Sequence, residues 1–144
     1  MKIFVLTFFV MLLTVIFPYV GFSAEKNYMV INLAGKNYKA ELEDNVTVRD
    51  ILNAMPLSLK MQRYAGHEYY AELPFRPEFA SERTSHIKAG HLYYWDGWSA
   101  FVINYEESNI APYKVVHIGR INNADEICEN LRNANDNISV NINK

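Results

Sequence analysis

The sequence predicts a single mainly β domain in which about eight short strands and two short helices enclose one core. The length of 144 residues is that of one domain. Several short segments alternate apolar and polar side chains, which is the pattern of half-buried strands. Turn signals that contain glycine or proline separate these segments. Only a β-sandwich or a closed β-barrel buries so many short strands around one core in a chain of this length.

The first 24 residues are expected to lie outside the fold, which leaves residues 25–144 as one domain. Lys2 precedes a largely apolar run, Ile3–Phe17, and small residues follow it. This arrangement is typical of a secretory signal peptide that is cleaved near Ser23. The run has fifteen residues, fewer than the ~20 that a membrane-spanning helix needs. We therefore expect an exported protein, periplasmic or extracellular, without stable membrane insertion after cleavage.

The first half of the domain is predicted to contain a hairpin, a helix and two further strands. An apolar strand at 28–33 and an alternating strand at 37–42 flank a glycine turn and form the hairpin. Thr47 is predicted to cap a helix over 47–55, since apolar residues recur there at helical spacing and Pro56 follows. Alternation then predicts strands at 57–62 and 68–73.

Residues 74–86 form the longest irregular stretch of the sequence. Pro74 and Pro77 remove backbone donors that a sheet would need, so we expect an ordered loop of the kind that often carries function. A strong hairpin signal follows the loop. Strands at 91–95 and 98–105 flank Asp96-Gly97, a pair that favours a type I′ turn.

The last part of the sequence predicts two strands on either side of a helix. Tyr113 to Ile118 is an apolar segment, and Gly119-Arg120 is expected to end it. Asn123 is expected to cap a helix over 124–133, whose apolar residues, Cys128 among them, share one face. Alternation over residues 138–142 predicts the final strand.

Four stretches, in this order, resemble the prokaryotic cyclophilin-like fold domains. They are Leu42–Asn45 with the following helix and Met55–Leu59, then Glu72–Pro74, Ile87–Tyr94 and Ile118–Ile121. These stretches lie between Leu42 and Ile121, and the resemblance as a whole covers residues 28–142. The resemblance implies a closed cyclophilin-like antiparallel β-barrel of about eight strands with two short capping helices, and it brings no catalytic set with it. His91 stands where the family commonly has an acidic residue.

Peptidyl-prolyl cis-trans isomerase activity is the enzyme alternative that this resemblance raises, and the sequence disfavours it. Phe101–Asn104 resembles the Phe-x-x-Gln segment of true cyclophilins, but Asn104 replaces the glutamine. Five residues before Phe101, where those enzymes have an arginine that bonds the prolyl amide, this chain has Asp96. An aspartate cannot donate that hydrogen bond, and the barrel by itself does not imply the activity.

Composition excludes several other function classes. Fourteen Lys and Arg against sixteen Asp and Glu give no basic excess, so we expect no nucleic acid partner. A single cysteine excludes an internal disulfide and a cysteine-built zinc site. Phosphate-loop, dinucleotide and nucleophile-elbow motifs are absent, so we expect no cofactor and no catalytic residues. The four histidines have no close spacing, so we expect no metal, although His86 and His91 can approach each other around Gly90.

Aromatic residues give the remaining functional signal. If Leu92 and Tyr94 point into the barrel, Tyr93 and Trp95 point out of it, and core packing does not easily account for both faces. The sequence therefore predicts a binding module for an unknown peptide, protein or small molecule, with packing under the long loop as the alternative. The predicted binding residues come from the loop and the following hairpin: Phe75, Arg76, Phe79, Arg83, Trp95 and Trp98.

Overall fold

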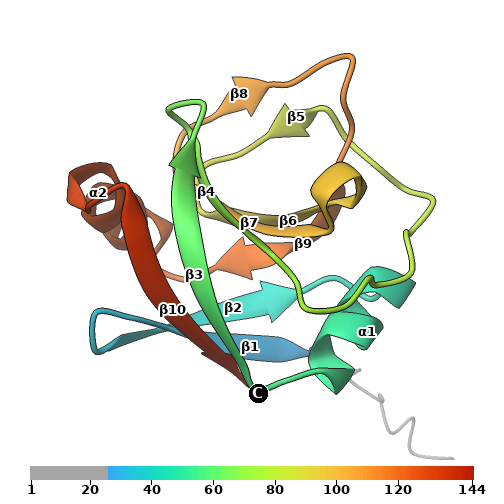
Figure 1. The fold of residues 1–144 in the computed structure, drawn as a ribbon, viewed down its shortest axis with the longest axis horizontal. Helices are drawn as coiled ribbons and strands as arrows, with labels where there is room; N and C mark the ends of the chain where they lie inside the picture. Colours follow the sequence, from blue (N-terminus) through green and yellow to red (C-terminus); the bar gives the residue numbers. More distant parts are fainter. Residues whose placement is uncertain (1–25) are drawn as a thin grey trace, which may run out of the picture.

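Eight alternating strands close into one antiparallel barrel (Figure 1) in the computed structural model, which describes residues 26–144. The predicted signal peptide, residues 1–24, lies outside the described residues. The order around the barrel is β1-β10-β3-β4-β7-β6-β9-β2. The strands are β1 Tyr28–Leu33, β2 Lys36–Leu42, β3 Leu57–Tyr64, β4 Glu68–Glu72, β6 His91–Trp95, β7 Ala100–Asn104, β9 Val116–Ile121 and β10 Asn137–Asn143. The closed barrel confirms the predicted fold class.

Alternate residues of every strand fill the barrel interior, because successive side chains of a strand point to opposite faces. The largest fully buried side chains include Tyr69 on β4, Tyr94 on β6 and Phe101 on β7. Two helices, α1 (Val46–Asn53) and α2 (Ala124–Asn133), lie at opposite ends of the barrel in Figure 1. Their buried residues join the same core, Cys128 of α2 among them. Neither helix of the described chain is long and apolar enough to cross a membrane.

The start of α1 differs from the prediction, because Asn45 and not Thr47 is the N-cap. Asn45 has extended backbone angles, and its side chain accepts a hydrogen bond from the Val48 amide at 2.9 Å. The Thr47 hydroxyl is fully buried and engages the long loop instead. It donates to the Glu78 carbonyl at 2.6 Å and accepts from the Ala80 amide at 3.0 Å. The prediction of a Thr47 cap was wrong because tertiary contacts claim this hydroxyl.

The turn between β6 and β7 is also not the predicted type I′ turn. Asp96–Trp98 form one 3₁₀ turn, η1, and the residue with positive φ is Ser99 at 46°, not Gly97. The Ser99 hydroxyl donates to the Phe75 carbonyl at 2.9 Å, so the loop before β5 holds the turn in place. As a result β7 begins at Ala100, and Trp98 lies in the turn beside Trp95, with ring centroids 4.3 Å apart.

Gly119 continues a strand that it was expected to break. β9 runs from Val116 to Ile121, three residues later than the predicted Tyr113–Ile118 strand. Gly119 pairs with Leu42 of β2, and a Cβ at this glycine would lie 2.3 Å from the Glu41 carbonyl oxygen. The glycine thus permits close approach of two backbones. The second helix and the last strand lie close to their predicted positions.

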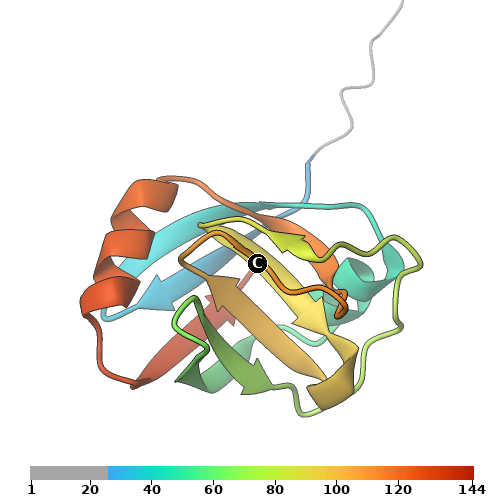
Figure 2. The same ribbon diagram turned by 90° about the horizontal axis from the view of Figure 1, so that it is seen from above.

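A small second sheet covers the outside of the barrel. β5 (His86–Ile87) pairs with β8 (Ser108–Asn109), and an isolated bridge joins Thr84 to Val115. Both views place these strands over β6 and β7 (Figures 1 and 2). We call residues 84–87 and 108–115 the flap. A second apolar cluster lies beneath it, made of Ile87, Tyr93, Ala100, Val102 and Val115, with Tyr70, Trp95 and Ile110 packed against it.

Candidate functional site

The candidate site is a cavity of about 260 Å³ on the outer surface of the barrel, next to the flap. We call it the aromatic pocket. Three segments line it: the β3–β4 hairpin, the β6–β7 hairpin and the flap. The lining residues are Tyr64, His67, Glu68, Tyr93, Trp95, Trp98, Val102, Ile87, Ile110, Tyr113 and Val115.

Strand alternation creates this pocket. On β6, Leu92 and Tyr94 are fully buried in the barrel, which turns Tyr93 and Trp95 outward. The outward residues that pair with them on β7 are small: Tyr93 lies opposite Val102, and Trp95 lies opposite Ala100. Small residues between large ones leave a hollow that the flap only partly covers. Tyr93 and Trp95 both line the pocket, and Tyr93 is also buried in the apolar cluster beneath the flap.

Exposed aromatic rings gather at the rim of this pocket. Among the described residues four large apolar side chains are exposed, and three of them line the pocket: Tyr64 at 45%, Trp98 at 41% and Tyr113 at 63%. The Tyr64 and Trp98 rings meet edge to face at 5.4 Å, and Trp95 meets Tyr113 in the same way at 6.2 Å. A cluster of exposed rings around a hollow is typical of a binding surface.

One carboxylate lies in this otherwise apolar surrounding. Glu68 opens β4 on the outer face, and its side chain is only 13% exposed. Its one polar contact among the described side chains is with Nδ1 of His67, 3.3 Å from Oε2. Burial away from water raises the pKa of Glu68 to about 7, because desolvation penalises the charged form. Glu68 is therefore poised between its neutral and charged forms near neutral pH.

Of the predicted binding residues, Trp95 and Trp98 line the aromatic pocket, whereas the four loop residues do not. Phe75 and Phe79 are half-buried and pack against the barrel core. Arg76 donates to the carbonyl and the carboxylate of Asp96, at 2.8 and 3.0 Å. The Arg83 guanidinium lies 4.6 Å from the centre of the Phe79 ring.

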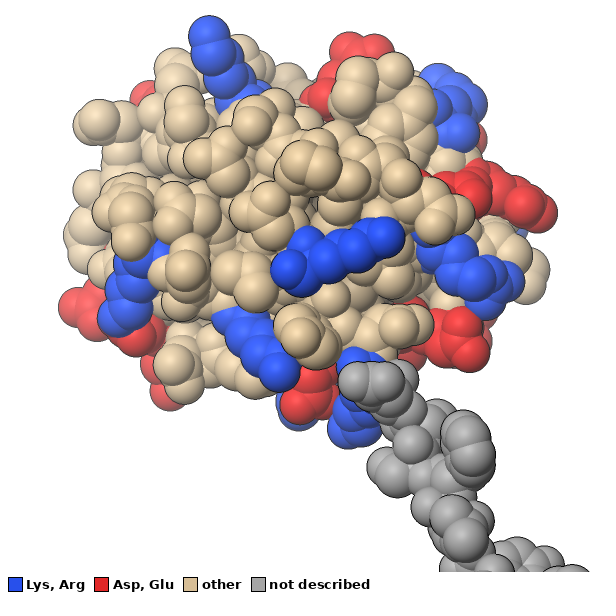
Figure 3. Space-filling view, turned by 90° about the horizontal axis from the view of Figure 1, so that it is seen from below, with Lys and Arg blue, Asp and Glu red and all other residues tan. Residues whose placement is uncertain are grey.

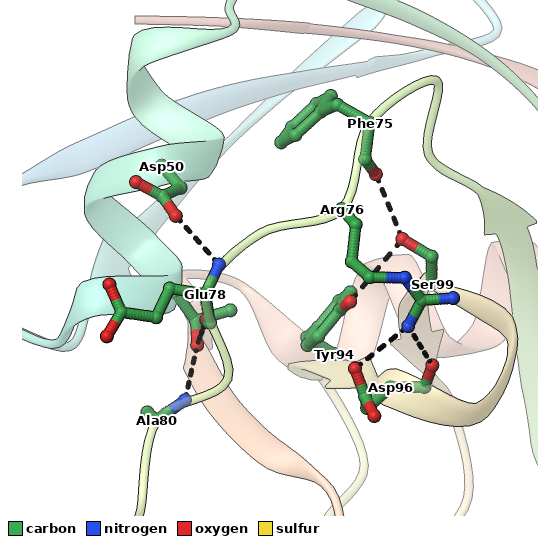
Figure 4. Close-up of polar contacts among 9 residues, drawn as sticks. Asp50, Phe75, Arg76, Glu78, Ala80, Tyr94, Asp96 and Ser99 are labelled. Carbon is green, nitrogen blue, oxygen red and sulfur yellow. Dashed lines mark hydrogen bonds and ion pairs between the residues drawn. The ribbon is translucent and has the colours of Figure 1, made fainter.

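The long loop is fixed to the barrel by hydrogen bonds at several points (Figure 4). Besides the contacts of Arg76 and Ser99, the Asp50 carboxylate accepts from the Glu78 amide at 2.7 Å. In Figure 4, Arg76 points toward the Asp96 turn, which also carries Trp98. The loop therefore supports the turn beside the aromatic pocket.

Nine of the eleven lining residues were not predicted as binding residues, and Tyr64, His67, Glu68 and Tyr113 are among them. Alternation alone places Glu68 on the outer face of its strand, where a carboxylate looks like an ordinary solvated residue. Its burial depends on the pairing of β4 with β7 and on the flap, which join segments more than thirty residues apart. Only the clustering of Tyr64, Tyr69 and Tyr70 around it gave a local signal in the sequence.

A second polar cluster lies on the outer ends of β6 and β9. His91 Nδ1 lies 2.8 Å from His117 Nε2, and His117 Nδ1 lies 2.9 Å from the Glu43 carboxylate. Burial, followed by repulsion from His117, lowers the pKa of His91 to about 4. His86 contacts Glu107 at 2.7 Å, while His91 contacts His117, so the two histidines that can approach each other around Gly90 have different partners. Within residues 26–144, no three potential metal ligands are grouped as a metal site.

In the segment that resembles the isomerase motif, Phe101 and Asn104 make buried structural contacts. Phe101 is fully buried in the barrel core. Asn104 is also fully buried, and its amide donates to the carbonyls of Lys88 and Glu106 at 3.1 and 2.6 Å. These contacts join the end of β7 to the chain on either side of the β6–β7 hairpin. Neither side chain lines the aromatic pocket.

Charged side chains are dispersed on the face of the barrel opposite to the view of Figure 2. Figure 3 shows lysine and arginine side chains there that are separated by uncharged and acidic residues. They do not merge into one basic patch on that face.

Comparison with known proteins matches the chain to one family. The model of the Cyclophilin-like family matches residues 31–143. Among solved structures, a hypothetical protein from Archaeoglobus fulgidus is 21% identical, with a TM-score of 0.55, over 82% of this chain and 94% of its own. McbB, solved in complex with tryptophan, is 10% identical, with a TM-score of 0.59, over 81% of this chain and 44% of its own. These structural likenesses show the fold alone. No curated protein matches the chain.

Proposed function

Since the chain belongs to the cyclophilin-like family, a barrel that by itself prescribes no chemistry, we propose that this protein is an exported binding module whose ligand occupies the aromatic pocket. Trp95 and Trp98 contact the ligand in this proposal. Arg76, with Phe75 of the same loop, positions the turn that carries Trp98. The proposed export rests on the sequence pattern of residues 1–24.

The observation that carries the proposal is the concentration of exposed aromatic rings around one hollow. Tyr64, Trp98 and Tyr113 expose large apolar surface to water, whereas most other large apolar side chains of residues 26–144 are buried. A ligand that fills the pocket removes this surface from water, and each Å² of buried apolar area contributes roughly 25 cal/mol. The cavity of about 260 Å³ is slightly smaller than the ~300–1,000 Å³ usual for drug-sized ligands. A small molecule or one side chain of a peptide fits this size.

Prolyl isomerisation remains the weaker alternative. The positions that correspond to the isomerase segment are Phe101 and Asn104, and both are held in the interior. A substrate peptide in the aromatic pocket would not reach either of them. The pocket supports binding without an evident acid, base and nucleophile set.

Intrinsic fluorescence offers a direct test, because both tryptophans of the protein line the pocket. A library of small aromatic and aliphatic fragments is titrated against the protein while tryptophan emission is recorded. We expect binding fragments to shift the emission, and we expect Tyr113→Ala to weaken them at least several-fold.

Tyr28→Ala is the matched control, because Tyr28 is an exposed tyrosine on β1 that does not line this pocket. Equal loss of binding in both tyrosine variants, or fragment contacts that map elsewhere by NMR, would contradict the proposal. Circular dichroism of each variant establishes that the barrel is intact.

A further inference from the structure

We propose that the aromatic pocket binds a small organic cation, an alkylated ammonium whose charge lies against Glu68 and whose alkyl groups contact the surrounding rings. This inference deepens the proposed function and rests on it. It assigns the chemistry of the ligand, which the shape of the cavity alone leaves open.

The first step of the argument is the charge of the pocket. Glu68 is the one acidic residue that lines it, and no lysine or arginine of the described chain does. The Glu68 side chain is only 13% exposed to water, and its one polar contact among the described side chains is with His67. Burying a charge in apolar surroundings is costly unless an opposite charge accompanies it. A cationic ligand supplies that opposite charge.

The second step concerns the walls. Five of the eleven lining residues are tyrosine or tryptophan: Tyr64, Tyr93, Trp95, Trp98 and Tyr113. The faces of such rings carry negative potential, which attracts a cation that lies within about 6 Å of a ring centre. Tryptophan gives the strongest attraction, and both tryptophans of the chain are here. A neutral apolar ligand would use the same walls but would leave the carboxylate with His67 as its one polar contact.

The third step distinguishes alkylated from primary ammonium groups. A primary ammonium brings three N–H donors, each of which needs an acceptor when it is buried. The lining offers few acceptors, since nine of its eleven residues are tyrosine, tryptophan, valine or isoleucine, whose side chains carry at most one hydroxyl. The Tyr93 hydroxyl already accepts from the Lys88 amide at 2.8 Å. Alkyl groups in place of N–H donors remove this requirement and contact the rings.

The ionisable groups around Glu68 define the expected pH dependence. His67 precedes Glu68 on the β3–β4 turn, and Tyr64 of β3 is its partner in the strand pairing. Tyr93 and Tyr113 line the pocket from β6 and the flap. With a pKa of about 7, Glu68 is about nine-tenths ionised at pH 8 and about one-tenth ionised at pH 6. The affinity for a permanent cation should therefore fall about tenfold between these two pH values.

The test compares choline with 3,3-dimethylbutan-1-ol, which has the same shape but carries no charge. Tryptophan emission and calorimetry report binding to the protein at pH 8 and pH 6. We expect choline to bind at least tenfold more tightly than the alcohol at pH 8, and its affinity to fall about tenfold at pH 6. Glu68→Gln should lower the affinity for choline at least tenfold and abolish most of its pH dependence. The same substitution should leave the affinity for the alcohol unchanged.

Three further variants keep the test specific. Glu72→Gln removes an exposed carboxylate from the same strand outside the pocket and should leave choline binding unchanged. Trp98→Leu keeps an apolar side chain but removes the ring, so it should weaken choline more than the alcohol. His67→Gln should retain the pH dependence if Glu68 is its source.

Failure of this inference is distinguishable from failure of the proposed function. If the alcohol or another neutral fragment binds as tightly as choline and Glu68→Gln does not change the affinity, the proposal of a cationic ligand is refuted. The pocket then remains a binding site. If no charged or neutral fragment binds in the pocket at millimolar concentration, both proposals are overturned.

Discussion

Replacing Glu68 by glutamine should change how the stability of the barrel depends on pH. Glutamine keeps the size of the side chain and removes its ability to ionise. Burial raises the pKa of Glu68 from 4.5 to about 7. The unfolded chain then loses its proton before the folded one as the pH rises through this interval. Burial of the Glu68 carboxylate therefore does not lower the free energy of unfolding below pH 4.5, where the group is protonated in both states. Above pH 4.5 the loss of stability grows until about pH 7.

The size of the effect follows from the shift in pKa. Each unit of difference between the folded and unfolded pKa corresponds to about 1.4 kcal/mol. The shift from 4.5 to about 7 thus predicts that ionised Glu68 lowers the free energy of unfolding by about 3 kcal/mol at pH 8. Relative to wild type, Glu68→Gln should become more stable by about this amount between pH 4.5 and pH 8.

Urea unfolding of both proteins at several pH values, followed by circular dichroism, measures this difference. Comparing the change with pH removes any constant cost of burying the glutamine amide. It also removes the titration of His91, whose lowered pKa affects both proteins alike and acts in the opposite direction, destabilising the fold as the pH falls from 6.5 toward 4. If the free energies of unfolding of the two proteins change with pH in parallel, the burial of a desolvated carboxylate in the pocket is refuted.

Four other outcomes follow from the structure. Thr47→Val removes both hydrogen bonds to the long loop and should cost about 1–3 kcal/mol in urea unfolding, with earlier proteolysis at residues 74–86. Gly119→Ala places a Cβ 2.3 Å from the Glu41 carbonyl oxygen and should cost at least about 1–3 kcal/mol, measured in the same way; an unchanged midpoint would contradict the close approach of β2 and β9. A proline-peptide assay should show no useful isomerase turnover, and robust turnover that Phe101→Ala abolishes would contradict this. Mass spectrometry of the native protein should find a chain that begins after about Ser23, whereas an intact Met1 in a membrane fraction would contradict export.

Local sequence patterns predict much of this fold, because each strand buries one face against a single interior. The alternation over residues 37–42 gives a strand, and Pro56 correctly marks the end of the first helix. The second helix has its predicted bounds because its apolar face and its polar neighbours both follow the helical period. The family resemblance selected a closed barrel over a sandwich, which local patterns had left open.

What the sequence did not predict depends on contacts between distant segments. Ser99 takes the positive φ in place of Gly97 because its hydroxyl is held by Phe75, which lies twenty-four residues earlier. Thr47 is drawn from the helix cap to the loop for a similar reason. Glu68 is buried only because the flap and the β6–β7 hairpin close around it. Trp95 and Trp98 could be found, since two indoles in one hairpin are conspicuous without any knowledge of the pairing.

The position of the pocket outside a filled barrel separates two sets of residues along the same strands. On β6 and β7 the inward residues, Tyr94 and Phe101 among them, hold the domain together, while their outward neighbours Trp95 and Val102 line the pocket. Selection can therefore act on one face of a strand without touching the other. A lineage that keeps this interior is free to exchange rings, charges and flap residues, and so to change what it binds while inheriting the same barrel.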